Sequence, residues 1–169
     1  MDLFEGADIE IRPPRVLMSL HAEYYDLMWS GEKVFEYRKR YGIDGPSSWY
    51  VYLNAPVSRL AAVIDLDPPI TGGPTEIADL AERARTGNGA SVLAYLEPAG
   101  RGVALPIRHV REYPGFTAEQ LTAALGKWHP PQGYTVIDRH PALAKICDEL
   151  TAATIVREQP IQARIAVVP

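Results

Sequence analysis

Four charged side chains that suit anion binding lie close together near the start of the 169-residue chain: Lys33, Glu36, Arg38 and Arg40. An arginine offers two parallel hydrogen bonds to an anion, a lysine acts as a point charge, and a glutamate accepts from a base edge or orients an arginine. The residue types therefore favour a site for a phosphate or a nucleotide. The pattern alone leaves open a plainer interpretation, an exposed ion pair worth about 0 to 1 kcal/mol.

The neighbouring elements are expected to hold these charges at a helix-to-strand junction. Residues 22 to 30 carry Tyr24, Leu27 and Met28 at helical spacing, and Gly31 stands where a helix ends in a left-handed residue. Residues 33 to 40 alternate, with aromatic side chains on one face and charged ones on the other. The sequence therefore predicts a half-buried strand with a charged face.

Further short elements are predicted along the chain, after an arm at residues 1 to 14. Strands at short intervals are typical of a barrel. A capping box at Thr117 and Gln120, Thr75 as a helix cap, and a hairpin-like link at residues 98 to 102 complete the prediction. The strands are expected at residues 16–20, 49–54, 60–66, 91–96, 103–113 and 161–168, and the helices at 75–85, 117–125 and 142–156. Residues 134–137 are expected to form either a last strand or an extended segment.

The composition narrows the classes of protein. A 47% hydrophobic content supports one folded domain, and a net charge of −4 argues against wrapping of a nucleic acid duplex, although residues 30 to 40 carry a local basic surplus. No membrane span or secretory signal is evident, and Cys147 is the single cysteine, so a cytoplasmic protein is expected. The scattered histidines give no metal site, and no cofactor is expected.

Several motifs in the same order resemble the ASCH family (activating signal cointegrator homology) of the PUA-like superfamily. The signature resembled is Gly31-x-Lys33-x-x-Glu36-x-Arg38. The companion motifs are residues 17–30, Tyr50-Val51-Tyr52-Leu53-Asn54-Ala55-Pro56, Ala61-Ala62-Val63-Ile64, Tyr113-Pro114-Gly115-Phe116 and Pro130-Pro131-Gln132-Gly133-Tyr134. The resemblance implies an α+β fold, a PUA-like β-barrel of the ASCH type with flanking helices, at residues 15 to 138. Residues 139 to 169 are expected to form a helix and tail packed on this barrel.

The resemblance also implies a positively charged cleft lined by Lys33, Glu36 and Arg38. Other candidate ligand contacts come from the residue types, and each has a structural alternative. Tyr52, with Tyr50, is a candidate for base stacking or for the core. Asn54 is a candidate for reading a ligand or capping a turn, and Arg40 for a phosphate contact. Gln132 and Tyr134, after a rigid Pro-Pro pair, are candidates for closing the cleft or for packing.

Three functions remain open from the sequence. The first is binding of RNA or a modified nucleotide in a small basic cleft. The second is a metal-independent hydrolase, either a ribonuclease or a nucleoside amidohydrolase, with Lys33 and Glu36 as the acid/base pair. In the acetylcytidine amidohydrolase branch of the family a threonine stands at the position of Glu36, which counts against deacylation. The third is a protein interaction domain that uses the apolar stripe of helix 142–156. The oligomeric state and the pathway are open.

Overall fold

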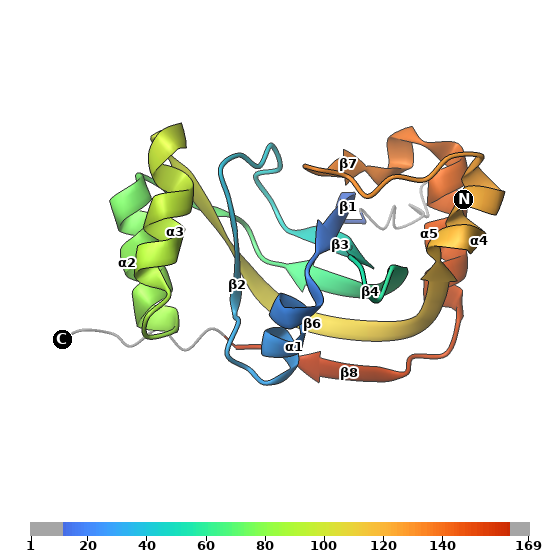
Figure 1. The fold of residues 1–169 in the computed structure, drawn as a ribbon, viewed down its shortest axis with the longest axis horizontal. Coiled ribbons are helices and arrows are strands. Elements are labelled where there is room, and N and C mark those ends of the chain that lie inside the picture. The colour runs from blue at the N-terminus through green and yellow to red at the C-terminus, as the bar shows by residue number, and fades with distance from the viewer. Residues whose placement is uncertain (1–11, 163–169) are drawn as a thin grey trace, which may run out of the picture.

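The computed structural model describes residues 12–162 of the chain (Figure 1). Within that range a single sheet of eight strands has the order β2-β6-β4-β3-β1-β7, and β5 and β8 also pair with β6. The sheet curls into a half-barrel, so the predicted α+β class is confirmed. The strands are β1 (Arg15–Leu20), β2 (Phe35–Arg38), β3 (Ser47–Leu53), β4 (Arg59–Leu66), β5 (Ile70–Gly72), β6 (Gly102–Thr117), β7 (Thr135–Val136) and β8 (Arg157–Pro160).

The helices gather at the two ends of the long strand β6. Figure 1 shows α2 and α3 beside each other at one end, α4 and α5 at the other, and α1 near the middle. Two short 3-10 turns link them to the sheet. The helices are α1 (Ala22–Trp29), α2 (Pro74–Ala84), α3 (Gly89–Leu96), α4 (Ala118–Leu125) and α5 (Pro141–Ala152), and the 3-10 turns are η1 (Glu97–Ala99) and η2 (Ile137–Arg139).

Strands β1 and β3 form the parallel pair of an otherwise antiparallel sheet, and this pairing matters for the site. Their register sets Leu20 opposite Leu53, so both strands end at the same edge. The backbone N–H of Asn54 then donates to the carbonyl of Leu20 at 3.0 Å. Residues that follow the two strands are thereby brought together, although more than thirty positions separate them in the sequence.

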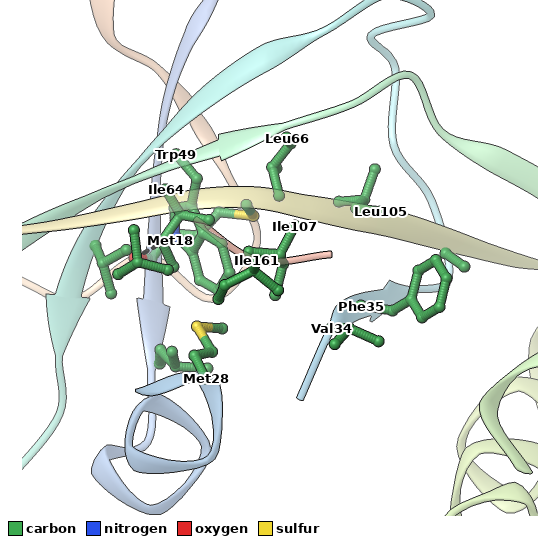
Figure 2. Packing of buried hydrophobic residues seen from close by; sticks show 14 of the residues in the cluster. Met18, Met28, Val34, Phe35, Trp49, Ile64, Leu66, Leu105, Ile107 and Ile161 are labelled. Atoms are coloured by element: carbon green, nitrogen blue, oxygen red, sulfur yellow. Dashed lines mark hydrogen bonds between the residues drawn. The ribbon is translucent and has the colours of Figure 1, made fainter. Parts of the chain in front are cut away.

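The sheet separates two apolar layers because successive side chains of a strand point to opposite faces. Trp49 and Val51 of β3 belong to one layer, whereas Tyr50 and Tyr52 belong to the other. Figure 2 shows the first layer, in which Met28 of α1 approaches the sheet and the side chains at the start of β2 extend the cluster. Helices α2 and α3 also cover this layer, and α4 and α5 cover the second.

The apolar stripe of α5 is part of the second layer. Leu143, Ile146, Cys147 and Leu150 are all buried against the chain itself. Burial also raises the pKa of the Cys147 thiol to about 12, so this thiol stays protonated near neutral pH. These four side chains are therefore occupied by intramolecular packing.

The predicted strand at residues 91–96 is wrong, because this segment is helix α3. Its buried side chains are Val92 and Leu96, which lie one helical turn apart, whereas a strand would have buried Ala94 with them. Gly89 permits the close approach of α2, since a Cβ at this position would lie 2.9 Å from the Cβ of Glu82. The predicted hairpin at residues 98–102 is consequently also wrong, and η1 takes its place.

The other predicted helices and strands have observed ends that differ by a few residues from the predicted ones. The capping box at Thr117 is confirmed, since the Gln120 N–H donates to the Thr117 hydroxyl and the Thr117 N–H donates to the Gln120 carboxamide. Helix α2 begins at Pro74 rather than being capped by Thr75. Helix α5 ends at Ala152, which leaves room for β8 before the predicted strand at 161–168. Most of that predicted strand, and most of the predicted arm at 1–14, lie outside the described residues.

Candidate functional site

The turn after α1 sets the position of Lys33. Gly31 has a φ of 80°, a left-handed conformation that glycine adopts without a Cβ penalty. The backbone N–H groups of Glu32 and Lys33 both donate to the carbonyl of Leu27 at 2.9 Å. This closed turn ends helix α1, as the sequence predicted. It places Lys33 two residues before β2 begins at Phe35.

The ammonium group of Lys33 is enclosed by polar and aromatic groups. Its Nζ donates to the carbonyl of Phe35 at 2.7 Å and lies 3.4 Å from a carboxylate oxygen of Glu36. The same atom lies 5.8 Å from the ring centre of Tyr24 and 5.4 Å from that of Tyr37. The Lys33 side chain is only 12% exposed, so its charge is held in a partly desolvated place.

Glu36 lies between two cations and has hydrogen-bonding capacity to spare. Its Oε2 faces Lys33, and its Oε1 lies 3.4 Å from the Nε of Arg38, with the Glu36 side chain 10% exposed. Neither contact has hydrogen-bond geometry: within residues 12–162, Glu36 Oε2 and Arg38 Nε have no hydrogen-bond partner. Buried polar atoms are normally bonded, so these two atoms are an exception within the site. We call Lys33, Glu36 and Arg38 the charged triad.

The charged triad lines a cleft of about 440 Å³, within the range of small-molecule sites. The cleft has walls from α1 and the end of β1, from β2, and from the junction of α2 with α3. Three basic side chains and two acidic ones line it. The lining residues are Ser19, Leu20, His21, Tyr24, Glu32, Lys33, Val34, Phe35, Glu36, Tyr37, Arg38, Asn54, Ala84, Arg85, Asn88, Ser91, Val92 and Tyr95.

Hydrogen bonds hold the wall at the junction of α2 and α3. The guanidinium of Arg85 donates to the Asn88 side-chain oxygen at 2.9 Å, and the hydroxyl of Ser91 donates to the same oxygen at 3.2 Å. Burial raises the pKa of Tyr37 to about 12, although the nearby Arg85 acts in the opposite direction. Tyr37 therefore presents a neutral hydroxyl, and the positive charge of Arg85 is not cancelled by a phenolate.

Four of the eight residues predicted to bind a ligand line this one cleft. They are Lys33, Glu36, Arg38 and Asn54. Asn54 reaches the cleft because β1 and β3 end together, a long-range pairing that places it near Ser19 and Leu20. The structure thus brings the predicted signature and the residue before the Ala-Pro corner to a single site.

The other four predicted residues do not line the cleft. Arg40 lies beyond the end of β2 and is exposed. Tyr52 is buried in the second layer, 4.9 Å from the ring of Trp128. Gln132 is exposed in the loop before β7. Tyr134 packs on the ring of Tyr41 at 5.2 Å, and its hydroxyl accepts from the Gly42 N–H.

The wall formed by Arg85, Asn88, Ser91 and Tyr95 was not predicted from the sequence. A strand at 91–96 would have placed Val92 on the opposite face from Ser91 and Tyr95, whereas helix α3 brings all three to the cleft. The signal that was present is the pair Val92 and Leu96, whose spacing also fits a helix. Tyr24 was noted only for its helical spacing.

A second groove, of about 620 Å³, lies around Trp128 and the first turn of α5. Its ionisable lining residues are Lys127, His129 and His140, and the rest of its lining is mostly proline and apolar. In the part of the chain that the structure covers, no cluster of His, Cys, Asp and Glu side chains has the geometry to hold a metal ion. Of the helices described, none is long and apolar enough to span a membrane.

The chain has the fold of an ASCH domain, as comparison with solved structures shows. The ASCH protein from Zymomonas mobilis has a TM-score of 0.69 at 19% identity, over 81% of this chain and 95% of that one. A variant of it with serine changed to alanine gives 0.70 at 18% identity, over 83% and 97%. A tyrosine-to-phenylalanine variant gives 0.69 at 18% identity, over 81% and 98%. The fold predicted from the motifs is confirmed.

Comparisons of the sequence find no match. No protein-family model matches the chain, and no curated protein matches it. At this identity the likeness to the Zymomonas mobilis protein concerns the fold alone, so the function of the cleft has to be argued from its own residues.

Proposed function

We propose that the cleft binds RNA or a modified nucleotide through a short, local contact with phosphate. The observation that carries this proposal is the charged triad, whose three side chains all line the same cleft. Three basic side chains around a cleft of about 440 Å³ suit one nucleotide better than a long polyanion. The net charge of −4 points the same way, because a large nucleic acid footprint needs a basic surplus.

In such a site each of these residue types has a different role. Lys33 and Arg38 neutralise a phosphate, the lysine as a point charge and the arginine through its planar donors. Glu36 accepts from a donor on the base while it keeps both cations in place. Arg85 adds a further positive charge from the opposite wall.

A salt titration tests the size of the contact. Binding of a short single-stranded RNA is measured at several salt concentrations, and the slope of log K against log salt is expected to be about −0.7 to −1.4, equivalent to one or two phosphates. The Arg40→Gln variant, whose side chain is exposed outside the cleft, should give the same slope.

Two results would contradict this proposal. A slope steeper than about −3.5 would mean that five or more phosphates are neutralised, more than the cleft can contact. Failure of the wild-type protein to bind any RNA or nucleotide in this titration would remove the proposal altogether.

A second candidate function is hydrolysis, and the 3.4 Å contact between Lys33 Nζ and Glu36 Oε2 is the observation that favours it. A lysine and a carboxylate in contact can act as an acid/base pair in phosphodiester cleavage. Mass analysis of the RNA recovered from the same titration separates the two functions. Intact RNA supports binding alone, whereas cleavage that disappears in Glu36→Gln supports a ribonuclease.

A further inference from the structure

Two exposed tyrosines stand on the cleft. Tyr24 is 40% exposed and Tyr95 is 42% exposed, among the few large apolar or aromatic side chains in residues 12–162 that are so open to solvent. Both line the cleft, Tyr24 from α1 and Tyr95 from α3. Figure 1 shows these two helices to the two sides of β2, which carries the triad residues Glu36 and Arg38. Aromatic rings left open at the rims of a cleft are a surface suited to a flat ligand.

Each of these rings has a lysine ammonium group nearby. Lys33 Nζ lies 5.8 Å from the ring centre of Tyr24, and Lys39 Nζ lies 4.9 Å from that of Tyr95. A base that stacks on either ring would therefore have a cation close to its own phosphate. Stacking on an aromatic side chain beside a positive charge is the usual way in which proteins hold single-stranded nucleic acid.

The ring of Tyr95 is also held on a rigid support. Val92 and Leu96, which flank it on α3, are buried in the first apolar layer. Ser91 and Arg85 both hydrogen-bond to Asn88 at the start of this helix. A ring on an anchored helix loses little freedom when a ligand stacks on it, so little of the stacking free energy is lost to ordering.

We propose that Tyr24 and Tyr95 are the base-stacking residues of the cleft, and that the site consequently takes an unpaired base. This inference rests on the proposed function, since it needs a nucleotide in the cleft. It adds a selectivity that the charged triad alone does not supply. A base stacked inside a duplex has no free face for a tyrosine, so double-stranded RNA is excluded and single-stranded RNA or a free nucleotide is accepted.

The experiment compares adenosine monophosphate with ribose 5-phosphate, which carries the phosphate and sugar without the base. Calorimetry on the wild-type protein is expected to give about five- to a hundredfold tighter binding of the nucleotide. Tyr24→Leu and Tyr95→Leu should each reduce this ratio at least about threefold, because they remove a ring on which only the nucleotide stacks. Tyr24→Phe and Tyr95→Phe, which keep the ring, should retain the wild-type ratio.

The outcomes separate this inference from the function on which it rests. If neither ligand binds, both the proposed function and the stacking role are wrong. If both ligands bind with equal affinity, or if the leucine variants keep the wild-type ratio, the cleft holds phosphate and the stacking role alone is wrong. Tight binding of a blunt RNA duplex without unpaired bases would also overturn the stacking role.

Discussion

Replacing Lys33 with methionine should lower the affinity for adenosine monophosphate by about ten- to a hundredfold, the value of one charge-assisted hydrogen bond to an anion. The methionine keeps most of the apolar stem between Tyr24 and Tyr37, so the loss comes mainly from the ammonium group. Removing it also takes one positive charge from the triad, so that Glu36 is balanced by Arg38 alone and no net positive charge remains there to attract phosphate.

The matched control is Lys145→Met, the same substitution at an exposed lysine of α5 that does not line the cleft. Its affinity should equal that of the wild-type protein. Circular dichroism of both variants checks that they are folded. If folded Lys33→Met bound the nucleotide as tightly as Lys145→Met does, the charged triad would have no part in binding.

Replacing Trp49 with alanine should lower the free energy of unfolding by about 3 to 5 kcal/mol. Trp49 is fully buried in the first apolar layer, and its indole N–H donates to the carbonyl of Met18 at 3.1 Å (Figure 2). The substitution leaves a cavity and also removes this hydrogen bond. Because domains of this size are stable by only about 5 to 15 kcal/mol, much of the stability would be lost. Chemical denaturation followed by circular dichroism gives the value.

Tyr95→Ala serves as the control for stability, because it also removes an aromatic ring but from an exposed position. Its expected effect on unfolding is within about 0.5 kcal/mol. A loss of less than about 1 kcal/mol for Trp49→Ala would contradict the packing of β1 against β3 around this ring.

The barrel strands were predictable from the sequence because their periodicity is clear. The runs that became β1, β3 and β4 are apolar, rich in β-branched and aromatic residues, and end at proline or polar residues. Helix α3 was not predictable in this way. Residues 92 to 96, a run of five apolar or aromatic residues, fit both periods, and the choice is made by tertiary packing of Val92 and Leu96 against the sheet.

The candidate site likewise has one part that could be predicted from the sequence and one part that could not. Lys33, Glu36 and Arg38 are local in sequence, so one turn and one short strand place them, and the signature identifies them. Arg85 and Asn88 reach the cleft only through the packing of α2 and α3 on β6 and on each other, which no local pattern contains. The wall of the cleft at the junction of α2 and α3 therefore could not be predicted from the sequence.

Tyr52 shows how a correctly predicted strand can still leave a candidate site residue outside the cleft. The strand at residues 49–54 was expected and is β3, but the parity of the alternation decides which layer each tyrosine enters. Trp49 and Val51 face the layer next to the cleft, so Tyr50 and Tyr52 face away from it. The sequence suggested Tyr52 as a base-stacking residue, whereas in our proposal the base stacks on Tyr24 and Tyr95.

The central claim is that the charged triad holds the phosphate of a nucleotide, and a crystal structure with adenosine monophosphate bound tests it most directly. We predict the phosphate within hydrogen-bond distance of Lys33 or Arg38 and the base against the ring of Tyr24 or Tyr95. A nucleotide bound instead in the groove around Trp128 and His129, with the cleft free of it, would contradict the account.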